Sequence, residues 1–305
     1  MILQHIADGI LTGAIVSLGA IGLSFSMKIL RFANFSHSEL LTWGAYFALV
    51  LYILHRLVGE PLGGALGPFS FGLPIVGAAA LSIVATAALA IALHRLVFAR
   101  LERRAGAMTM VFASFGVALL LRNLVLLIFG PDPIYYNTAL QFAIRLPGGV
   151  RVLPDQIFVL GVTIAVVIGL HLFLTRSRAG IAMRAVAENP DLAAVSGTDT
   201  GRVILWVWVI GAGGAALAGL FYGMTVQLRP ELGFGLILPL FAAAILGGVG
   251  SLYGAVLGGL IVGLAENLAV MVIPTGYKPA IPFLLILAIL YLRPQGIFGS
   301  TGERT

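Results

Sequence analysis

Uncharged apolar runs long enough to cross a membrane recur along this 305-residue chain, and they constrain its fold more than any other feature. A helix rises about 1.5 Å per residue, so roughly 20 apolar residues are needed to cross a hydrocarbon core of about 30 Å. Composition agrees, because only 10% of the residues are charged, against about 25% in soluble domains. We therefore expect an all-α, polytopic transmembrane helix bundle that forms one domain over residues 1–305.

The apolar pattern predicts nine segments, at 9–29, 39–57, 74–98, 109–129, 154–175, 203–226, 236–247, 254–273 and 280–293. Segment 236–247 is the shortest of them, and a helix of that length reaches only about 18 Å. Nine segments cross if it spans the membrane, and eight cross if it is re-entrant.

Glycines spaced four residues apart predict close contacts between helices, because small residues let two backbones approach in a membrane. The pairs and triplets are Gly9 and Gly13, Gly219 and Gly223, Gly250 with Gly254 and Gly258, and Gly259 and Gly263.

The distribution of basic residues predicts which loops face the cytoplasm. If the N-terminus lies outside, twelve Lys and Arg residues fall on one side and five on the other, and Arg122 lies within a span. Cytoplasmic loops carry the excess of Lys and Arg, so the twelve-residue side is predicted to be cytoplasmic. That side includes the loop at 176–202 and the residues Arg103, Arg104 and Arg304. We expect an outside N-terminus and a cytoplasmic C-terminus.

Several function classes are excluded by missing residue types. The chain has no cysteine and only five scattered histidines, so neither thiol chemistry nor a metal site is predicted. Neither Lys28 nor Lys278 is followed by Ser or Thr, so the phosphate-binding motif of an ATPase is missing. The basic residues form no patch suited to nucleic acid. We expect a chain that binds no cofactor and is not itself an enzyme.

A charged segment at 176–202, between two apolar runs, contains both the start and the stop signals of a helix. In "AENPDLAAVSG", Asn189 suits the N-cap, Pro190 the first helical position and Asp191 the positive end of the helix dipole. Gly197 can adopt the left-handed conformation that ends a helix. A helix of about seven residues, on the order of 10 Å long, is predicted there.

This short helix has a small apolar face made by Leu192 and Val195. Before it, "GIAMRAVAE" predicts a second short helix, with Arg184 and Glu188 one turn apart. A capped, partly apolar helix on a loop suits docking to another protein. A solvated connector lying on the membrane surface fits the same residues equally well, so the physical argument leaves both interpretations open.

Four stretches of the chain, at 184–197, 33–46, 245–267 and 292–299, together resemble permeases of the branched-chain amino acid transport family of ABC importers. The run "RAVAENPDLAAVSG" is similar to the coupling loop of importer permeases, although it fits their E-A-A-x-x-x-G pattern loosely. "ANFSHSELLTWGAY" (33–46) resembles the family's N-F-A-H-G-E stretch, with Ser36 and Ser38 where Ala and Gly are usual. The Gly-rich run at 245–267 resembles a segment ending in G-x-A-E, and "LRPQGIFG" (292–299) resembles the family's R-P-x-G ending.

The resemblance covers nearly the whole chain and implies the permease subunit of an ATP-driven importer in a prokaryotic inner membrane, surrounded by lipid. It implies a second homologous permease, two cytoplasmic ATP-binding subunits and an extracytoplasmic solute-binding protein as partners. ATP would bind to the partner subunits, and no nucleic acid would be involved. The coupling loop would comprise Arg184, Glu188, Asn189, Pro190, Asp191, Leu192 and Gly197.

Two deep charges are candidates for a solute pathway, because a charge at mid-membrane costs about 2.5 to 3.5 kcal/mol and needs a reason. Glu266 shares a helix stripe with Gly259 and Gly263 and should point into the bundle, and Asn267 follows it. Arg122 lies at a similar predicted depth, so we hypothesise that Arg122 and Glu266 pair or line one polar cavity. The alternatives are structural hydrogen bonding by Glu266 and snorkelling of Arg122 to the outer interface.

Asn34, His37 and Glu39 lie at the predicted cytoplasmic start of the second span. They could line the exit of the pathway or form a polar cap at the membrane interface.

The rival to an importer subunit is an ion-coupled secondary transporter or channel acting alone. Such a protein usually carries ionisable relays at mid-membrane, and Glu266 and Arg122 are few for that purpose. The sequence does not choose between branched-chain amino acids, urea and short amides as the solute.

Overall fold

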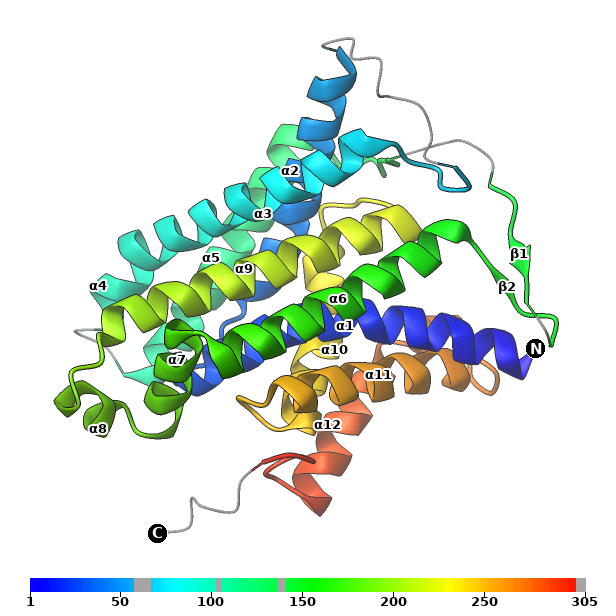
Figure 1. The fold of residues 1–305 in the computed structure, drawn as a ribbon. Coiled ribbons are helices and arrows are strands. Elements are labelled where there is room, and N and C mark those ends of the chain that lie inside the picture. Colours follow the sequence, from blue (N-terminus) through cyan, green and yellow to red (C-terminus); the bar gives the residue numbers. More distant parts are fainter. Residues whose placement is uncertain (58–66, 103–105, 137–140, 147, 300–305) are drawn as a thin grey trace.

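The computed structural model describes residues 1–57, 67–102, 106–136, 141–146 and 148–299. The regular structure of this part is almost entirely helical, which confirms the predicted all-α polytopic class (Figure 1). Its first half contains α1 (Ile2–Leu30), α2 (Ser36–Leu57), α3 (Leu73–Leu93), a π-helical turn (His94–Phe98), α4 (Ala99–Glu102) and α5 (Ala107–Phe129). Its second half contains β1 (Ile144–Arg145), β2 (Arg151–Val152), α6 (Pro154–Arg176), α7 (Arg178–Glu188), α8 (Pro190–Val195), α9 (Thr200–Thr225), α10 (Leu232–Gly247), α11 (Leu252–Ala269), a 3-10 turn (Thr275–Tyr277) and α12 (Ala280–Leu292).

Seven helical stretches among the described residues are long and apolar enough to cross a membrane. One of them is the continuous run Leu73–Glu102, which joins α3 to α4. The other six are α1, α2, α5, α6, α9 and α11. Helices α10 and α12 are apolar but have only 16 and 13 residues, about 24 and 20 Å of helix. The predicted short segment 236–247 lies within α10. Whether a short helix crosses the membrane or is re-entrant is therefore a question for both α10 and α12.

The largest difference from the predicted boundaries is at the start of α1, which begins at Ile2 and not at residue 9. Residues 2–8 include polar side chains, so an apolar pattern does not assign them to a span. Gln4 in this first part of the helix is bonded to the hairpin of β1 and β2. The Gln4 Nε2 donates to the Arg151 carbonyl at 3.1 Å, and the Gln4 Oε1 accepts from the Arg151 N–H at 2.9 Å.

Helix α1 is the central helix of the bundle and is buried along most of its apolar length (Figure 1). The predicted glycine contacts are confirmed between α1 and α11. A Cβ atom on Gly13 would lie 2.7 Å from the Leu260 Cα, and one on Gly9 would lie 2.9 Å from the Leu264 Cα. The two backbones therefore touch at a spacing that only glycine permits.

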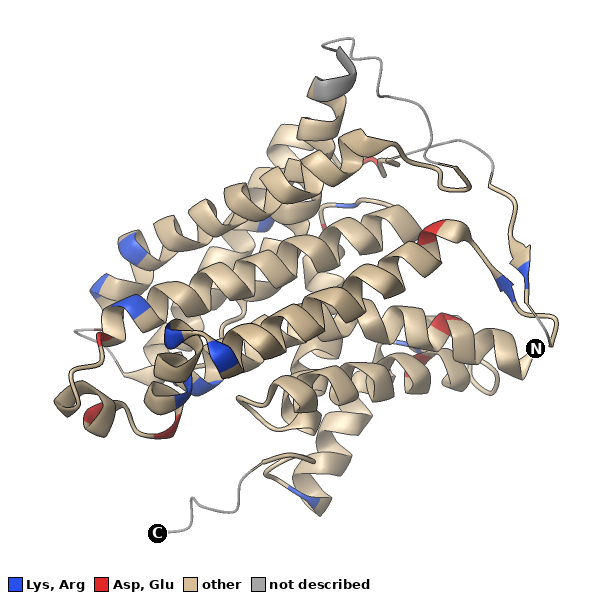
Figure 2. Ribbon diagram, in the orientation of Figure 1, with Lys and Arg blue, Asp and Glu red and all other residues tan. Residues whose placement is uncertain are grey.

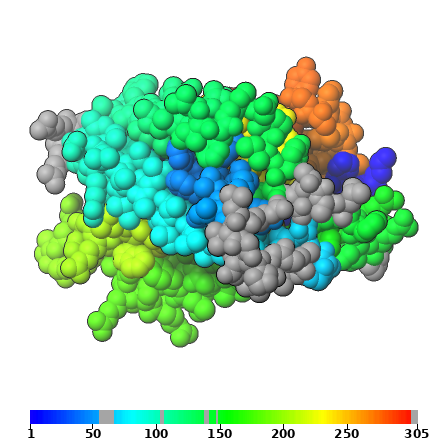
Figure 3. Space-filling view, turned by 90° about the horizontal axis from the view of Figure 1, so that it is seen from above, coloured from blue at the N-terminus to red at the C-terminus, as the bar shows by residue number. Residues whose placement is uncertain are grey.

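Helices α3, α5 and α6 form the outer surface of the bundle, and most residues of each are either partly or fully exposed. Seen from above, α3 and α5 cover much of one face, and part of α2 shows between them (Figure 3). Val84 of α3 is 66% exposed and Leu127 of α5 is 81% exposed. Such surfaces suit contact with lipid chains.

The two ends of the bundle differ in content. Helices α4, α7 and α8 and the start of α9 lie at one end, here called the α8 end, where most Lys and Arg residues gather (Figure 2). The N-terminus and the β1–β2 hairpin lie at the other end, here called the hairpin end (Figure 1). The N-terminus and the 176–202 loop are thus at opposite ends, as predicted. Arg103, Arg104 and Arg304 lie outside the described residues.

Helix α2 begins inside the bundle, which corrects the prediction that "NFSHSE" lies at a membrane face. The His37 Nε2 lies 3.0 Å from the Gly19 carbonyl oxygen. Gly19 comes eleven residues before the end of α1 at Leu30, which is about 16 Å along the helix axis. Arg31 turns the chain with a left-handed φ of 57°, and residues 32–35 lead back inward. An apolar pattern marks where a span starts along the chain but not how deep the preceding turn lies.

Candidate functional site

The short helix α8 has the capping that its sequence predicts. It begins at Pro190, and the Asn189 Oδ1 accepts a hydrogen bond of 3.0 Å from the Leu192 N–H. It ends at Val195, and Gly197, two residues later, has a left-handed φ of 84° and donates its N–H to the Ala194 carbonyl at 3.0 Å. Both ends of the helix are therefore closed by local hydrogen bonds, as a short helix in water requires.

Helix α8 exposes its two large apolar side chains, whereas α7 buries two of its own. Leu192 is 64% exposed and Val195 is 88% exposed, and Asp191 lies in the first turn beside them. Met183 and Val186 of α7 are buried against the bundle. The segment thus has an anchored base and a protruding tip, and α8 lies beyond the ends of α6 and α9 (Figure 1).

A hollow of about 700 Å³ lies beside α7 at the α8 end. Its lining includes Lys28 and Arg31 from the end of α1, Glu188 from the end of α7, and residues 294–295 from the C-terminal segment. Arg184 is exposed on α7. The sequence did not predict this hollow, because its walls come from four separate parts of the chain.

The polar residues at the start of α2 are buried in the bundle, with Asn34, His37 and Glu39 each at most 2% exposed. The Asn34 Oδ1 accepts hydrogen bonds from the Ser36 N–H at 3.1 Å and from the Ser36 hydroxyl at 2.7 Å. The Asn34 Nδ2 has no hydrogen-bond partner among the described residues. These groups therefore form a polar region near the middle of α1.

Glu39 connects α2 with the start of α10. The Thr42 hydroxyl donates to the Glu39 Oε2 at 3.2 Å and accepts from the Gly233 N–H at 2.8 Å. The Glu39 carboxyl also interacts electrostatically with Arg122 of α5 and with Glu231, which immediately precedes α10. Two of the predicted pathway residues, Glu39 and Arg122, are thus brought close together, and Glu231 joins them.

The hypothesised direct pairing of Arg122 with Glu266 is wrong. The Arg122 Nη2 lies 3.7 Å from the Glu231 Oε1, and the guanidinium carbon lies 4.9 Å from the centroid of the Phe234 ring. The Glu266 Oε2 lies 4.0 Å from the Lys278 Nζ. Helix α5 packs on α2, whereas α11 packs on α1, α10 and α12. Equal depth on two helices therefore does not put two residues on a shared face.

Glu266 points into the bundle as predicted and is 5% exposed. The neighbouring Asn267 Nδ2 donates to the Thr12 hydroxyl at 3.2 Å and to the Gly263 carbonyl at 2.8 Å. The Asn267 Oδ1 accepts from the Lys278 Nζ at 3.3 Å. These contacts brace α11 against α1 and against the turn that follows α11.

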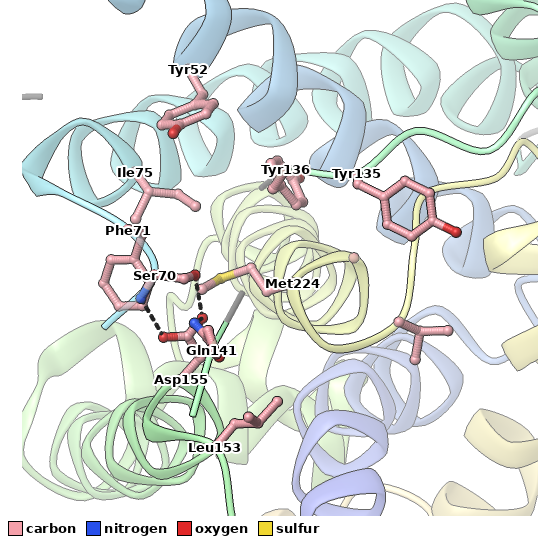
Figure 4. Close-up of a pocket in the computed structure, with 12 residues that line it drawn as sticks. Tyr52, Ser70, Phe71, Ile75, Tyr135, Tyr136, Gln141, Leu153, Asp155 and Met224 are labelled. Carbon is pink, nitrogen blue, oxygen red and sulfur yellow. Dashed lines mark hydrogen bonds between the residues drawn. The ribbon is translucent and has the colours of Figure 1, made fainter. Parts of the chain in front are cut away.

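A second cavity, of about 280 Å³, lies toward the hairpin end between α2, α3, α6 and α9 (Figure 4). Tyr52 and Met224 form part of its wall. Asp155, at the start of α6, accepts hydrogen bonds from the Ser70 N–H at 3.0 Å, from the Ser70 hydroxyl and from the Gln141 Nε2 at 2.6 Å. One buried carboxylate thus holds two loops over the cavity. Sequence reasoning missed it, because its partners lie 85 and 14 residues away.

Tyr136 fixes the loop after α5 beside this cavity. Its hydroxyl donates to the Ala45 carbonyl of α2 at 2.6 Å. Burial raises the pKa of Tyr136 well above its usual range, so the phenol stays protonated and can keep donating this bond.

Comparison with known proteins gives the chain clear relatives. The family described as "Branched-chain amino acid transport system / permease component" matches residues 5–290. The "High-affinity branched-chain amino acid transport system permease protein BraD" of Pseudomonas aeruginosa is 33% identical over 302 residues, which cover 97% of this chain and 95% of the relative. The corresponding protein LivH of Escherichia coli is 32% identical over 305 residues, with the same coverage. A solved structure titled "PsaBC from Streptococcus pneumoniae in complex with Fab" has a TM-score of 0.49 and 13% identity, covering 98% of this chain and 94% of its own.

Proposed function

The chain belongs to the family of branched-chain amino acid transport permease components, and on that premise we propose that it is the membrane-spanning subunit of an ATP-driven importer for branched-chain amino acids or similar small solutes. The observation that carries the proposal beyond the family match is α8, a capped helix with an exposed apolar tip at the basic end of the bundle. Such a tip is suited to receive force from a separate protein.

The α8 end is proposed to face the cytoplasm and the hairpin end the exterior of an inner membrane. The gathering of Lys and Arg at the α8 end supports this orientation (Figure 2). Contacts at both ends of α10 also support a crossing by this short helix. Before α10, Leu228 pairs with Ile134, which follows α5. After α10, the Gly250 N–H donates to the Ser24 hydroxyl near the far end of α1.

Helix α12 is proposed to make the last crossing. It follows the turn of Lys278, which contacts α11 at the hairpin end, and the Ile297 N–H after it donates to the Leu246 carbonyl at the end of α10. Nine crossings then give an outside N-terminus and a cytoplasmic C-terminus.

Two cytoplasmic ATPases are proposed to bind α8, and a second homologous permease and an external solute-binding protein complete the transporter. Leu192 and Val195 would supply the apolar contact with the ATPase. Met183 and Val186 anchor α7 to the bundle, so displacement of α8 would move the helices behind it. ATP hydrolysis would occur on the partners, and this chain would need no cofactor of its own.

Asn34, His37, Glu39 and Arg122 are proposed to border the solute pathway. Buried polar groups in a membrane bundle are costly, which is why they frequently mark pathways. The unpartnered Asn34 Nδ2 and the proximity of Glu39 to Arg122 support this assignment. The contacts of Glu266 and Asn267 support the structural alternative for that pair, namely bracing of α11.

ATP-dependent uptake of labelled leucine into proteoliposomes tests the proposal. Vesicles with this chain, the partner permease, the ATPases and the binding protein should accumulate leucine only with ATP, and vesicles with this chain alone should not. Uptake by this chain alone under an ion gradient would instead establish the rival, a secondary transporter or channel. Competition by urea or short amides would identify a different solute class.

A matched pair of α8 variants controls for assembly. The double substitution Leu192→Ser and Val195→Ser should abolish ATP-driven uptake while the chain still inserts and binds its partner permease. Ala194→Ser, at another exposed position of α8, should leave uptake near the wild-type rate.

A further inference from the structure

Arg122 and Glu231 lie on the outside of the single-chain bundle, and we propose that they face a water-filled pathway where they bind the carboxylate and the ammonium group of a zwitterionic amino acid. The inference rests on the proposed import function and deepens it, because it names the chemistry by which this chain contacts the solute. It is carried by the depth, the exposure and the geometry of the two side chains.

The pair lies at membrane depth, in the half of the bundle nearer the hairpin end. Arg122 comes seven residues before the end of α5 at Phe129, which is about 10 Å along the helix axis. Glu231 immediately precedes α10, and the Gly233 N–H two residues later is bonded to Thr42 inside the bundle. Arg122 thus lies well inside the length of α5, and Glu231 lies in the turn between α9 and α10, two residues before a backbone group that is bonded inside the bundle.

Both side chains reach the surface of the bundle at that depth. The Arg122 side chain is 30% exposed and the Glu231 side chain is 48% exposed. A charged group that faces lipid chains is strongly unfavourable, which favours water or another protein as the neighbour of this face. Two exposed apolar side chains lie near Arg122: Phe234, whose ring lies against the guanidinium, is 42% exposed, and Leu119, one helical turn away on α5, is 40% exposed. A charged pair within an apolar border matches a solute that has two charged groups and an apolar side chain.

The geometry leaves the two groups free to bind a ligand. Their separation of 3.7 Å exceeds the roughly 2.7–2.9 Å of a charge-assisted hydrogen bond, so neither group is locked by the other. A guanidinium can hold a carboxylate by two parallel N–H bonds, and the Phe234 ring lies against the Arg122 guanidinium. The carboxylate of Glu231 can accept from an ammonium group, and Glu39 lies behind it within electrostatic range. Urea and neutral amides have no charges that need such a pair.

Cysteine labelling tests whether the face is wetted, because the chain has no cysteine of its own. Leu119→Cys, one turn before Arg122, is the reporter, and Val84→Cys on α3 is the control. In the assembled transporter in membrane vesicles, methanethiosulfonate ethylammonium should modify the reporter at least about tenfold faster, since a thiolate forms readily only in water. Val84 is more exposed from the bundle than Leu119, so burial within this chain would not explain a slower control.

Protection by solute tests the zwitterion. Leucine should slow modification of the reporter, whereas leucinamide, which lacks the carboxylate, and 4-methylpentanoate, which lacks the ammonium group, should not at the same concentration. In the reporter background, Arg122→Gln should raise the leucine concentration for half-protection about tenfold or more, because a charge-assisted hydrogen bond is lost. Arg145→Gln, in the exposed hairpin, should leave it unchanged. If Arg122→Gln does not assemble, Glu231→Gln should give the same loss of protection.

Equal modification rates for the reporter and the control would overturn the water-filled face. Equal protection by leucine and leucinamide, or unaltered protection in the Arg122→Gln and Glu231→Gln variants, would overturn the zwitterion site. ATP-driven leucine uptake is measured in the same vesicles. If leucine uptake proceeds but the labelling or the protection experiment gives a contradicting result, only the inference about Arg122 and Glu231 is rejected. If the vesicles take up no leucine at all, the proposed import function is rejected, independently of the labelling results.

Discussion

Single glycines decide how closely the central helix α1 meets α11. Inside a membrane, helices associate through close packing and not through exclusion of water, so contact at the backbone matters more than it does in a soluble bundle. Gly9 and Gly13 of α1 face the backbone of α11 at Leu264 and Leu260. Any side chain at these positions has to push the two helices apart.

Replacing Gly13 by valine should therefore destabilise the bundle. A Cβ atom there would lie 2.7 Å from the Leu260 Cα, and overpacking of this kind costs about 1–3 kcal/mol. The apparent melting temperature in detergent should fall. Gly116→Ala in α5, where a Cβ atom would meet nothing within 4 Å, should leave it unchanged or raise it slightly. Equal shifts in both variants would contradict close packing of α1 on α11.

Local residue roles could be predicted from the sequence, but partners across helices could not. The cap by Asn189 and the left-handed Gly197 follow from residue type and short spacing. The partner of Arg122 does not, because it depends on which way α5 faces in the bundle, and a pattern along one helix has no information about that. Asp155 was missed for the same reason, since it reads as an ordinary residue in the first turn of a helix.

At the scale of elements, α8 depends on its ends and on α7. Six residues are far too few for a stable isolated helix in water. The Asn189 side chain supplies one of the few hydrogen bonds that hold the first turn, and Gly197 closes the last. Helix α7, which directly precedes the Asn189 cap, anchors α8 to the bundle through its buried side chains.

Removal of the Asn189 N-cap should weaken the coupling between α8 and the ATPase subunits. Asn189→Ala should cost about 1 kcal/mol of helix stability, and Asn189→Asp should retain the cap. Copurification of the ATPases and ATP-driven uptake should both fall several-fold in the alanine variant and stay near wild type in the aspartate variant. Full activity of Asn189→Ala would mean that docking does not need a preformed α8.

The apolar pattern predicted where each helix lies along the chain, but it did not predict how deep in the bundle a helix begins. Eight of the nine predicted segments begin within a few residues of the observed helices, and α1 is the exception. The start of α2 lies inside the bundle because the chain turns back after α1 and brings His37 against Gly19, and this tertiary contact leaves no periodic pattern in the sequence.

At the scale of the whole molecule, the bundle is asymmetric from end to end. The α8 end carries the basic residues, the protruding helix and the larger hollow. The hairpin end carries the cavity closed over by the loops that Asp155 holds. Between them, the polar residues at the start of α2 approach the exposed Arg122 and Glu231. This order of parts is what a subunit needs if solute enters at one end and force at the other.

The central claim is that α8 lies in the cytoplasm and is the point where a separate motor acts. Labelling of Val195→Cys with an impermeant thiol reagent tests it most directly, since the chain has no other cysteine and this position is 88% exposed. The thiol should react in inside-out vesicles, should not react in right-side-out vesicles, and should be protected when the ATPase subunits are bound. Reaction from the outside, or no protection by bound ATPases, would contradict the account.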